Sequence, residues 1–206
     1  MKMSKRTWLV IVTVLIALSA VGGLIVLAAN AGDAAVYFPL KPGNTWNYKL
    51  TIGGEQNIFL QKVKVSNPEN GNPKVIVYNN DTPYYYVYYL ENERGLYKTR
   101  AMSPAGIDEY KPNWLVLSYN MKVGSIWKWE SEDHKMKEST KVIAIEKVTV
   151  SAGTFDTVLI QSEGVNGAGD SYSVKSWYAK NIGLVKDETT IKGTLQKSEL
   201  VSYQVN

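Results

Sequence analysis

The chain has 206 residues, enough for one substantial domain and a targeting segment. It contains no cysteine, which excludes disulfides, thiolate metal sites, a cysteine nucleophile and the lipid-modified cysteine of a bacterial lipoprotein. The net charge of +4 includes three basic residues in the first six positions, and the rest of the chain holds 20 basic and 19 acidic residues. This near-neutral balance excludes the concentrated basic face of a nucleic-acid-binding protein.

Residues 1–31 have the pattern of a signal peptide or an N-terminal membrane anchor. Basic residues at positions 2, 5 and 6 precede an uncharged apolar run from Trp8 to Ala29. A helix of this length covers roughly 33 Å, enough to cross a bilayer, but Ala29-Asn30-Ala31 is an A-x-A cleavage site. The sequence leaves both forms open, release after cleavage near Ala31 or a membrane tether through residues 8–29. In either form residues 32–206 are exported to the envelope or the extracellular space.

The segment from Leu40 to Tyr48, Leu-Lys-Pro-Gly-Asn-Thr-Trp-Asn-Tyr, predicts a Pro-Gly turn followed by a strand. From Thr45 apolar and polar residues alternate, which places the large aromatic side chains on one face. Residues 121–129 repeat the pattern Leu/Met-Lys-x-Gly-x-x-Trp-x-aromatic. The repeat predicts a β domain made of two related halves, with these aromatic residues in its core.

About twelve short strands separated by turn residues follow, and no stretch after Ala31 sustains an apolar period of 3.6 residues. We therefore predict an all-β antiparallel fold, preceded by an N-terminal apolar helix. A curved sheet, an open barrel and a sandwich all remain open. Residues 101–113, with two prolines and a glycine, are expected to be a linker with room for a short helix between halves at 37–105 and 114–206.

A second repeat supports the two halves. Residues 88–98 and 177–186 each contain an aromatic pair, a turn and Gly-Leu-x-Lys. Together with the turn at 40–48 and the segment Val148–Phe155, these motifs resemble a group of exported bacterial β domains that are mainly described as domains of unknown function. The resemblance covers residues 37 to about 203 and implies the fold and an exported location, without any catalytic residue. Members often have a lipoprotein cysteine, which this chain lacks.

Catalytic and metal-binding patterns are weak throughout the chain. The single histidine, His134, lies in a run of charged residues that is typical of a solvated turn, although it could act as a base or join Glu132 and Asp133 at a metal. No Gly-x-Ser-x-Gly elbow is present. The pairs Glu91/Glu93 and Glu130/Glu132 share strand faces and are expected on a charged outer surface. We predict no catalytic residue, no metal site and no cofactor.

Fourteen tyrosines and six tryptophans are the remaining signal. Aromatic side chains on strands can stack on sugars, line an apolar cavity or form a protein interface, and burial in the core also accounts for them. The candidate ligand-binding residues are Tyr84, Tyr86, Tyr88, Trp127, Trp129 and Trp177.

The function that follows is a non-enzymatic exported domain that binds a partner protein, a glycan or an apolar ligand. One alternative is a lipid or hydrophobic-ligand carrier or chaperone of half-barrel type. A second alternative is a hydrolase that uses carboxylates alone, with Glu130, Glu132 and His134 as the residues to replace.

Overall fold

The computed structural model describes residues 34–54, 58–79 and 81–206. The apolar run at 8–29 and the cleavage site at Ala31 lie outside the described residues, so the helix and its processing stay predictions. In the part of the chain that is described, no helix is both long enough and apolar enough to cross a membrane.

Twelve antiparallel strands form one sheet, which confirms the all-β prediction. A short 3-10 helix, η1 (Ala34–Val36), precedes them. The strands of the first half are β1 (Thr45–Ile52), β2 (Ile58–Glu69), β3 (Asn72–Asn79), β4 (Thr82–Asn92), β5 (Gly95–Ser103) and β6 (Gly106–Ser118). Those of the second half are β7 (Ile126–Glu130), β8 (Lys137–Val150), β9 (Gly153–Val165), β10 (Ser171–Ala179), β11 (Gly183–Ile191) and β12 (Thr194–Gln204).

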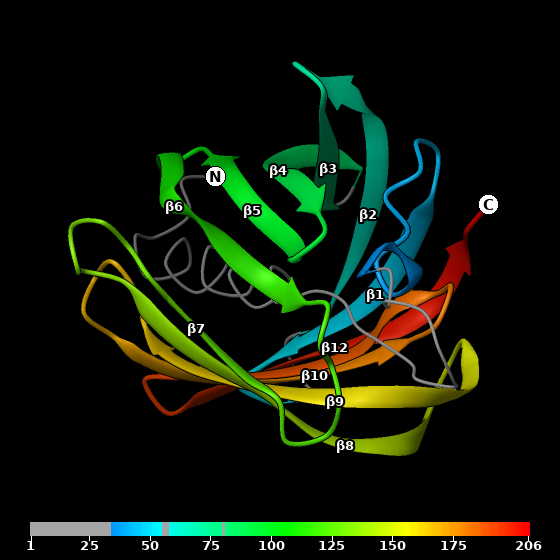
Figure 1. Ribbon diagram of the computed structural model, residues 1–206. Helices are drawn as coiled ribbons and strands as arrows, with labels where there is room; N and C mark the ends of the chain where they lie inside the picture. Colours follow the sequence, from blue (N-terminus) through cyan, green and yellow to red (C-terminus); the bar gives the residue numbers. More distant parts are fainter. Residues whose placement is uncertain (1–33, 55–57, 80) are drawn as a thin grey trace.

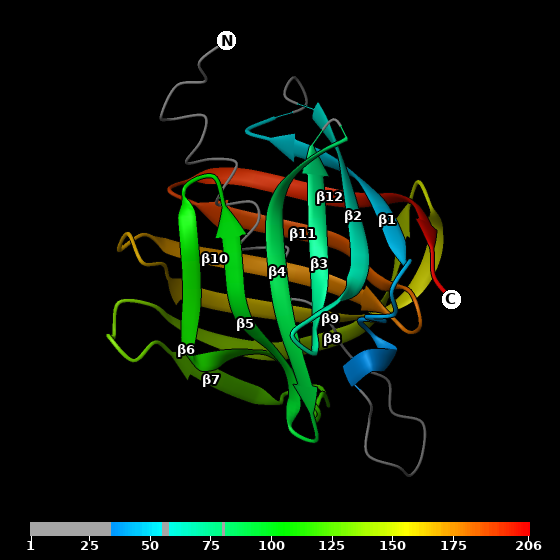
Figure 2. The same cartoon turned by 90° about the horizontal axis from the view of Figure 1, so that it is seen from above.

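The strand order is β6-β5-β4-β3-β2-β1-β12-β11-β10-β9-β8-β7. Each strand therefore pairs with its sequence neighbours, except that β1 pairs with β12 and that β6 and β7 are the two edges. The sheet curls so that β2–β6 lie over β8–β10 (Figure 1), and seen from above the two sets of strands cross one another (Figure 2). Of the three predicted architectures, the nearly closed, barrel-like sheet is the one formed.

Aromatic stacking and isolated hydrogen bonds, instead of a β-ladder, close the seam between β6 and β7. Trp114 of β6 stacks on Trp129 of β7, with ring centroids 4.9 Å apart. The Trp129 indole N–H donates to the carbonyl of Pro112 at 2.8 Å, and the backbone N–H of Glu132 donates to the carbonyl of Lys111 at 2.6 Å. The seam thus depends on a few aromatic and polar contacts.

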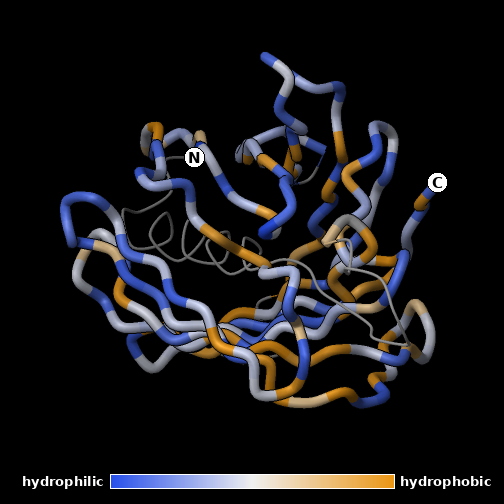
Figure 3. Tube along the Cα trace, viewed as in Figure 1, coloured by the Kyte–Doolittle hydropathy of each residue, from blue (hydrophilic) through white to orange (hydrophobic). Residues whose placement is uncertain are grey.

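Strand alternation directs one set of side chains inward, and hydrophobic and hydrophilic residues accordingly alternate along most strands (Figure 3). One end of the interior is filled by the segment after η1. Phe38 stacks on Trp46 and meets Tyr89 edge to face. The Trp46 N–H donates to the carbonyl of Ile182 at 2.6 Å, which ties this end to the second half. We call this aromatic cluster the plugged end.

The repeated turns of the two halves have matching hydrogen bonds. Gly43 N–H donates to the Val65 carbonyl and Gly124 N–H to the Val142 carbonyl, both at 2.9 Å. The two glycines have φ values of +96° and +92°, which L residues rarely adopt. The second repeat likewise falls on equivalent hairpins, β4–β5 and β10–β11.

The prediction of a linker at 101–113 is wrong. These residues form the β5–β6 hairpin, with the ladder resuming on either side of a break between Lys98 and Arg100. Prolines misled the interpretation, since Pro112 lies in that break and Pro104 lies in the hairpin turn. The chain passes from one half to the other at residues 119–125 instead.

The glycine geometry predicts a graded effect on stability. An added Cβ has open space at Gly43 and Gly124 but would overlap the Leu117 carbonyl oxygen at Gly95. We expect Gly43→Ala and Gly124→Ala each to lower the free energy of unfolding by about 1–2 kcal/mol through backbone strain alone. Gly95→Ala should lower it by more, because the β5–β6 backbone must also shift. Urea denaturation measures all three, and an equally mild Gly95→Ala would contradict this packing.

Candidate functional site

A row of buried, mostly polar side chains crosses the inner face of the second half. Successive pair partners from β12 to β7 form it: Gln196, Thr189, Val174, Ser162, Thr140 and Trp127. Gln196 also pairs with Ile52, the last residue of β1. Trp46 lies six residues earlier on β1, so this polar row lies about 20 Å from the plugged end. The interior therefore has an aromatic end and a polar end.

Several buried polar atoms of the interior have no hydrogen-bond partner in the described part of the chain. Both amide atoms of Gln196 and the indole nitrogen of Trp127 are among them, at opposite ends of the polar row. Others are Gln61 Oε1, Asn79 Oδ1 and the hydroxyls of Tyr37 and Tyr178, which lie outside the polar row. A dry, filled core satisfies almost all such groups, so the three unpaired atoms of Gln196 and Trp127 mark the polar row as a candidate binding surface.

Lys98 of β5 is fully buried inside a cage of aromatic rings. Its Nζ lies 4.9 Å from the Tyr110 ring centroid, 5.0 Å from that of Trp114 and 6.0 Å from that of Tyr85. It has no hydrogen-bond partner among the described residues. Burial lowers the pKa of Lys98 to about 7, against the opposing influence of the Asp108 and Glu138 carboxyl groups. The rings stabilise the cation but leave its donors unused.

Glu138 of β8 is hydrogen-bonded at the edge of the Trp114 indole. Its carboxylate accepts from Trp114 Nε1 at 3.0 Å, from the Tyr172 hydroxyl at 2.8 Å and from Thr140 Oγ1 at 3.2 Å. Burial raises the pKa of Glu138, and these three donors oppose the shift. A cation over the ring and a carboxylate at the N–H thus contact one indole and connect β5 and β6 of the first half to β8 and β10 of the second.

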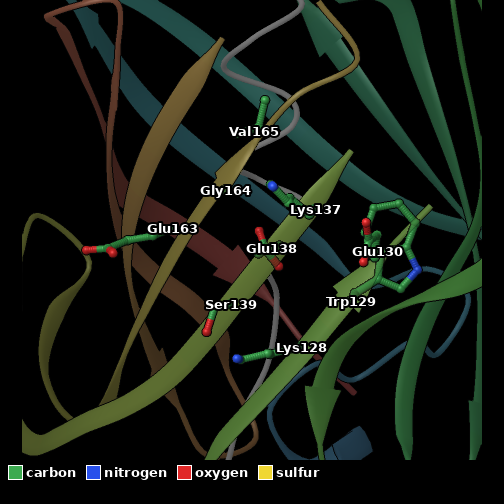
Figure 4. A pocket seen from close by; sticks show the side chains of 9 residues that line it. All are labelled: Lys128, Trp129, Glu130, Lys137, Glu138, Ser139, Glu163, Gly164 and Val165. Carbon is green, nitrogen blue, oxygen red and sulfur yellow. The ribbon is translucent and has the colours of Figure 1, made fainter. Parts of the chain in front are cut away.

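A pocket of about 570 Å³ opens beside Glu138 at the ends of β7, β8 and β9. Figure 4 shows Glu138 on the central strand, with Trp129 on the neighbouring strand on one side and Gly164 on the other. Charged residues, including Lys128, Lys137 and Glu163, surround them. The pocket gives an opening to the outside at the polar end.

Asp187 of β11 is a second buried carboxyl group next to the polar row. Ser176 Oγ donates to it at 2.9 Å and Thr189 Oγ1 at 3.0 Å. Burial raises the pKa of Asp187 to about 7, although these two hydrogen bonds favour the charged form. It therefore changes charge near neutral pH.

The structure brings two of the predicted ligand-binding residues together on the inner face. Trp127 and Trp129 lie two residues apart on β7 and are both buried. Tyr84 is part-buried at the edge of the interior, where its hydroxyl accepts from Gln61 Nε2 at 2.7 Å.

The other three predicted residues are on the outer face, in two separate places. Lys74 Nζ lies 5.3 Å from the Tyr86 ring and 5.8 Å from that of Tyr88, and Arg100 covers Tyr88 at 4.1 Å. Trp177 lies on β10, where Lys186 covers its ring and its indole N–H donates to Glu146. The six candidates therefore do not form a single site.

The weak catalytic candidates lie on the outside, as expected. His134 has a positive φ in the turn after β7, and its Nδ1 is 2.9 Å from Glu130 Oε1 on the exposed surface. Among the described residues no group of three or more histidine and acidic side chains is arranged to hold a metal ion.

Sequence reasoning missed Lys98, Glu138 and Asp187. Period 2 offered a signal for Glu138, which is in phase with Thr140 and Val142 along β8. It offered none for Lys98. The motif Gly-Leu-x-Lys occurs twice, yet Lys186, the counterpart of Lys98, lies outward and pairs with Glu188 at 2.9 Å.

Bulges at different positions account for the opposite orientations of the two lysines. Trp177 and Tyr178 pair with Lys186 and Leu184, so the extra residue of β11 is Val185. Tyr88 and Tyr89 pair with Arg100 and Lys98, so the extra residue of β5 is Thr99. A bulge reverses the face of every residue beyond it. The one before Lys186 turns it outward, whereas Lys98 precedes its bulge and stays inward.

Asp187 predicts a loss of stability with rising pH. Its pKa of about 7 in the folded protein exceeds the value of about 3.9 in an unfolded chain, so between these values the folded state binds more protons. The free energy of unfolding should fall across that window. Asp187→Asn should flatten the fall and raise stability at pH 8 by about 1–3 kcal/mol. Urea denaturation from pH 4.5 to 8 measures this, with Glu163→Gln, an exposed carboxyl group on β9, as the control that keeps the slope.

Lys98 predicts the opposite slope at higher pH. Its pKa of about 7 in the folded protein is below the value of about 10.4 in an unfolded chain, so between these values the unfolded state binds more protons. Stability should therefore rise from pH 7 to 9.5. We expect Lys98→Met to remove this rise and to be more stable than the wild type at pH 6, by about 1–4 kcal/mol. A large loss of stability in Lys98→Met would show that the cation is needed for folding.

Comparison with known proteins finds a family match to part of the chain and two similar structures. The family described as DUF3108-like matches residues 125–205, from the turn before β7 through β12. Two solved structures are similar: a proposed lipoprotein from Parabacteroides distasonis, 16% identical, and a proposed exported protein with a YmcC-like fold from Bacteroides fragilis, 13% identical. Each match has a TM-score of 0.44 and covers 82% of this chain and 99% of the other. No curated protein matches the chain.

Proposed function

We propose that residues 32–206 are an exported, non-enzymatic domain that binds a small apolar or amphiphilic molecule on the inner face of its curved sheet. The pattern of residues 1–31 supports export, with the domain either released near Ala31 or tethered through residues 8–29. The role is that of a carrier of half-barrel type.

The observation behind the proposal is the set of buried polar atoms without partners at the polar end. Leaving such an atom unsatisfied in a dry core costs about 1–3 kcal/mol. Gln196 and Trp127 contribute three of these atoms, and their cross-strand neighbours are Ile52, Thr189 and Thr140. Small-molecule sites use a few polar groups to fix the orientation of the ligand, and these atoms are available for that role.

The arrangement of the two ends also supports an internal ligand. Phe38 and Trp46 fill the plugged end, while the polar end adjoins the pocket beside Trp129 and Glu138. A molecule would enter there, next to a seam that has few backbone hydrogen bonds to break.

A glycan or a partner protein would meet other residues. The outer cluster of Lys74, Tyr88 and Arg100 adjoins a pocket of about 290 Å³, but its aromatic ring is covered by the two cations. Stacking on a sugar needs an exposed ring. The outer cluster therefore supports a glycan site less well than the inner face supports a site for an apolar ligand.

The proposal predicts that the purified chain releases a small molecule on denaturation. Native mass spectrometry should show an added mass that organic extraction removes. The extracted protein should then bind N-phenyl-1-naphthylamine, a neutral apolar dye, saturably. Protein without added mass that also fails to bind the dye would contradict the proposal.

Substitutions at two neighbouring threonines test whether the dye binds on the inner face. Thr189 belongs to the buried polar row, and Thr190 beside it is exposed. We expect Thr189→Trp to fold, as judged by circular dichroism, and to lose dye binding at least about tenfold, while Thr190→Trp and the isosteric Thr189→Val retain it. If Thr189→Trp unfolds while Thr189→Val folds, the inner face is filled by side chains and leaves no room for a ligand.

A further inference from the structure

We propose that the Lys98 ammonium group binds the carboxylate of the ligand, so that the molecule carried is an apolar chain or ring system ending in a single carboxylate. This inference rests on the proposed function, because it assigns the chemistry of one end of the same ligand.

Lys98 is the interior cation whose hydrogen-bonding capacity is unused. It is fully buried, and its Nζ has no hydrogen-bond partner in the described part of the chain. Tyr85, Tyr110 and Trp114 supply ring faces at 4.9–6.0 Å, which attract a cation but accept no strong hydrogen bond from it. A buried charge without a counter-ion in contact is costly, and a ligand anion would remove that cost.

The two nearby carboxyl groups do not fill this role. Glu138 accepts hydrogen bonds from Trp114, Tyr172 and Thr140. Asp108 is exposed on β6. Neither one is hydrogen-bonded to Lys98, so the ammonium donors remain available to a ligand oxygen.

The charge of the site favours a carboxylate over the alternatives. A carboxylate would form a charge-assisted hydrogen bond with Lys98, which is roughly twice as strong as the bond to a neutral ester or alcohol oxygen. A phosphate carries up to two negative charges, and the single ammonium group of Lys98 would neutralise only one of them. A single cation beside a buried acid therefore fits a singly charged ligand.

Two pockets lie near the aromatic cage of Lys98, and each is lined by a ring that belongs to the cage or stacks on it. Tyr110, a wall of the cage, also lines the outer pocket of about 290 Å³, at the point where the β5–β6 ladder is interrupted beyond Lys98. On the inner side Trp129 stacks on Trp114 and lines the pocket of about 570 Å³. Lys98 lines neither pocket, so the proposal places the body of the ligand in the larger pocket, against Trp129 and Val165, and requires the two indoles to move for its carboxylate to reach Lys98.

The test compares a matched pair of ligands, decanoate and methyl decanoate, on the extracted full-length protein at pH 6.5. Displacement of N-phenyl-1-naphthylamine measures both affinities. We expect the wild type to bind the acid at least about tenfold more tightly than the ester, which corresponds to about 1.4 kcal/mol. Lys98→Met should bind both about equally, with its ester affinity within about twofold of the wild type. Lys128→Met, which removes an exposed cation at the pocket rim, should keep the preference.

The outcomes separate this inference from the proposed function. If neither ligand displaces the dye and the dye itself does not bind, the proposed function fails. If the wild type binds acid and ester equally, or if Lys98→Met keeps the preference for the acid, the domain binds apolar molecules but Lys98 does not recognise a carboxylate. Urea denaturation at pH 6.5 confirms that the Lys98→Met protein is folded before it is titrated.

Discussion

The structure depends on the pairing of β1 with β12. This ladder joins the first and last strands of the chain, and it places the two six-strand halves side by side in one sheet. Because the ladder lies in the middle of the sheet, both free edges come from the middle of the chain, at β6 and β7. The curled sheet brings these edges together, and they close through Trp114 and Trp129. The topology thus explains why the sheet has a seam, and why that seam lies between β6 and β7.

The interior differs from a uniform hydrophobic core along its length. At the plugged end Phe38 packs against Trp46 and Tyr89, and the Trp46 indole and the Tyr48 hydroxyl donate to the backbone carbonyls of Ile182 at 2.6 Å and Leu184 at 2.9 Å. At the polar end the side chains are just as buried but their polar atoms are only partly satisfied. The polar end therefore keeps buried hydrogen-bonding groups that a ligand would satisfy.

Lys98, Trp114 and Glu138 belong both to the contacts that close the sheet and to the proposed ligand site. The cation lies over the ring whose N–H donates to the carboxylate, so the three groups join strands of both halves across the seam. Burial shifts the pKa of Lys98 downward and that of Glu138 upward, and both shifts favour the neutral forms. A ligand carboxylate at Lys98 would change the charge balance of a contact that helps to close the sheet, which would couple binding to closure.

The sequence by itself determined the strands, the repeated turns and the inward phase of residues such as Trp46 and Trp127. These features depend on local rules, namely period-2 alternation and the positive φ of Gly43 and Gly124. The β5–β6 hairpin was missed because prolines that usually mark a linker lie here in a turn and at a break in the ladder. Only the tertiary structure decided that Lys98 is buried while Lys186, in the same motif, is exposed. The reason is physical: a bulge is placed by pairing with a neighbouring strand, at Thr99 in one half and Val185 in the other, and each bulge reverses the faces of the residues beyond it.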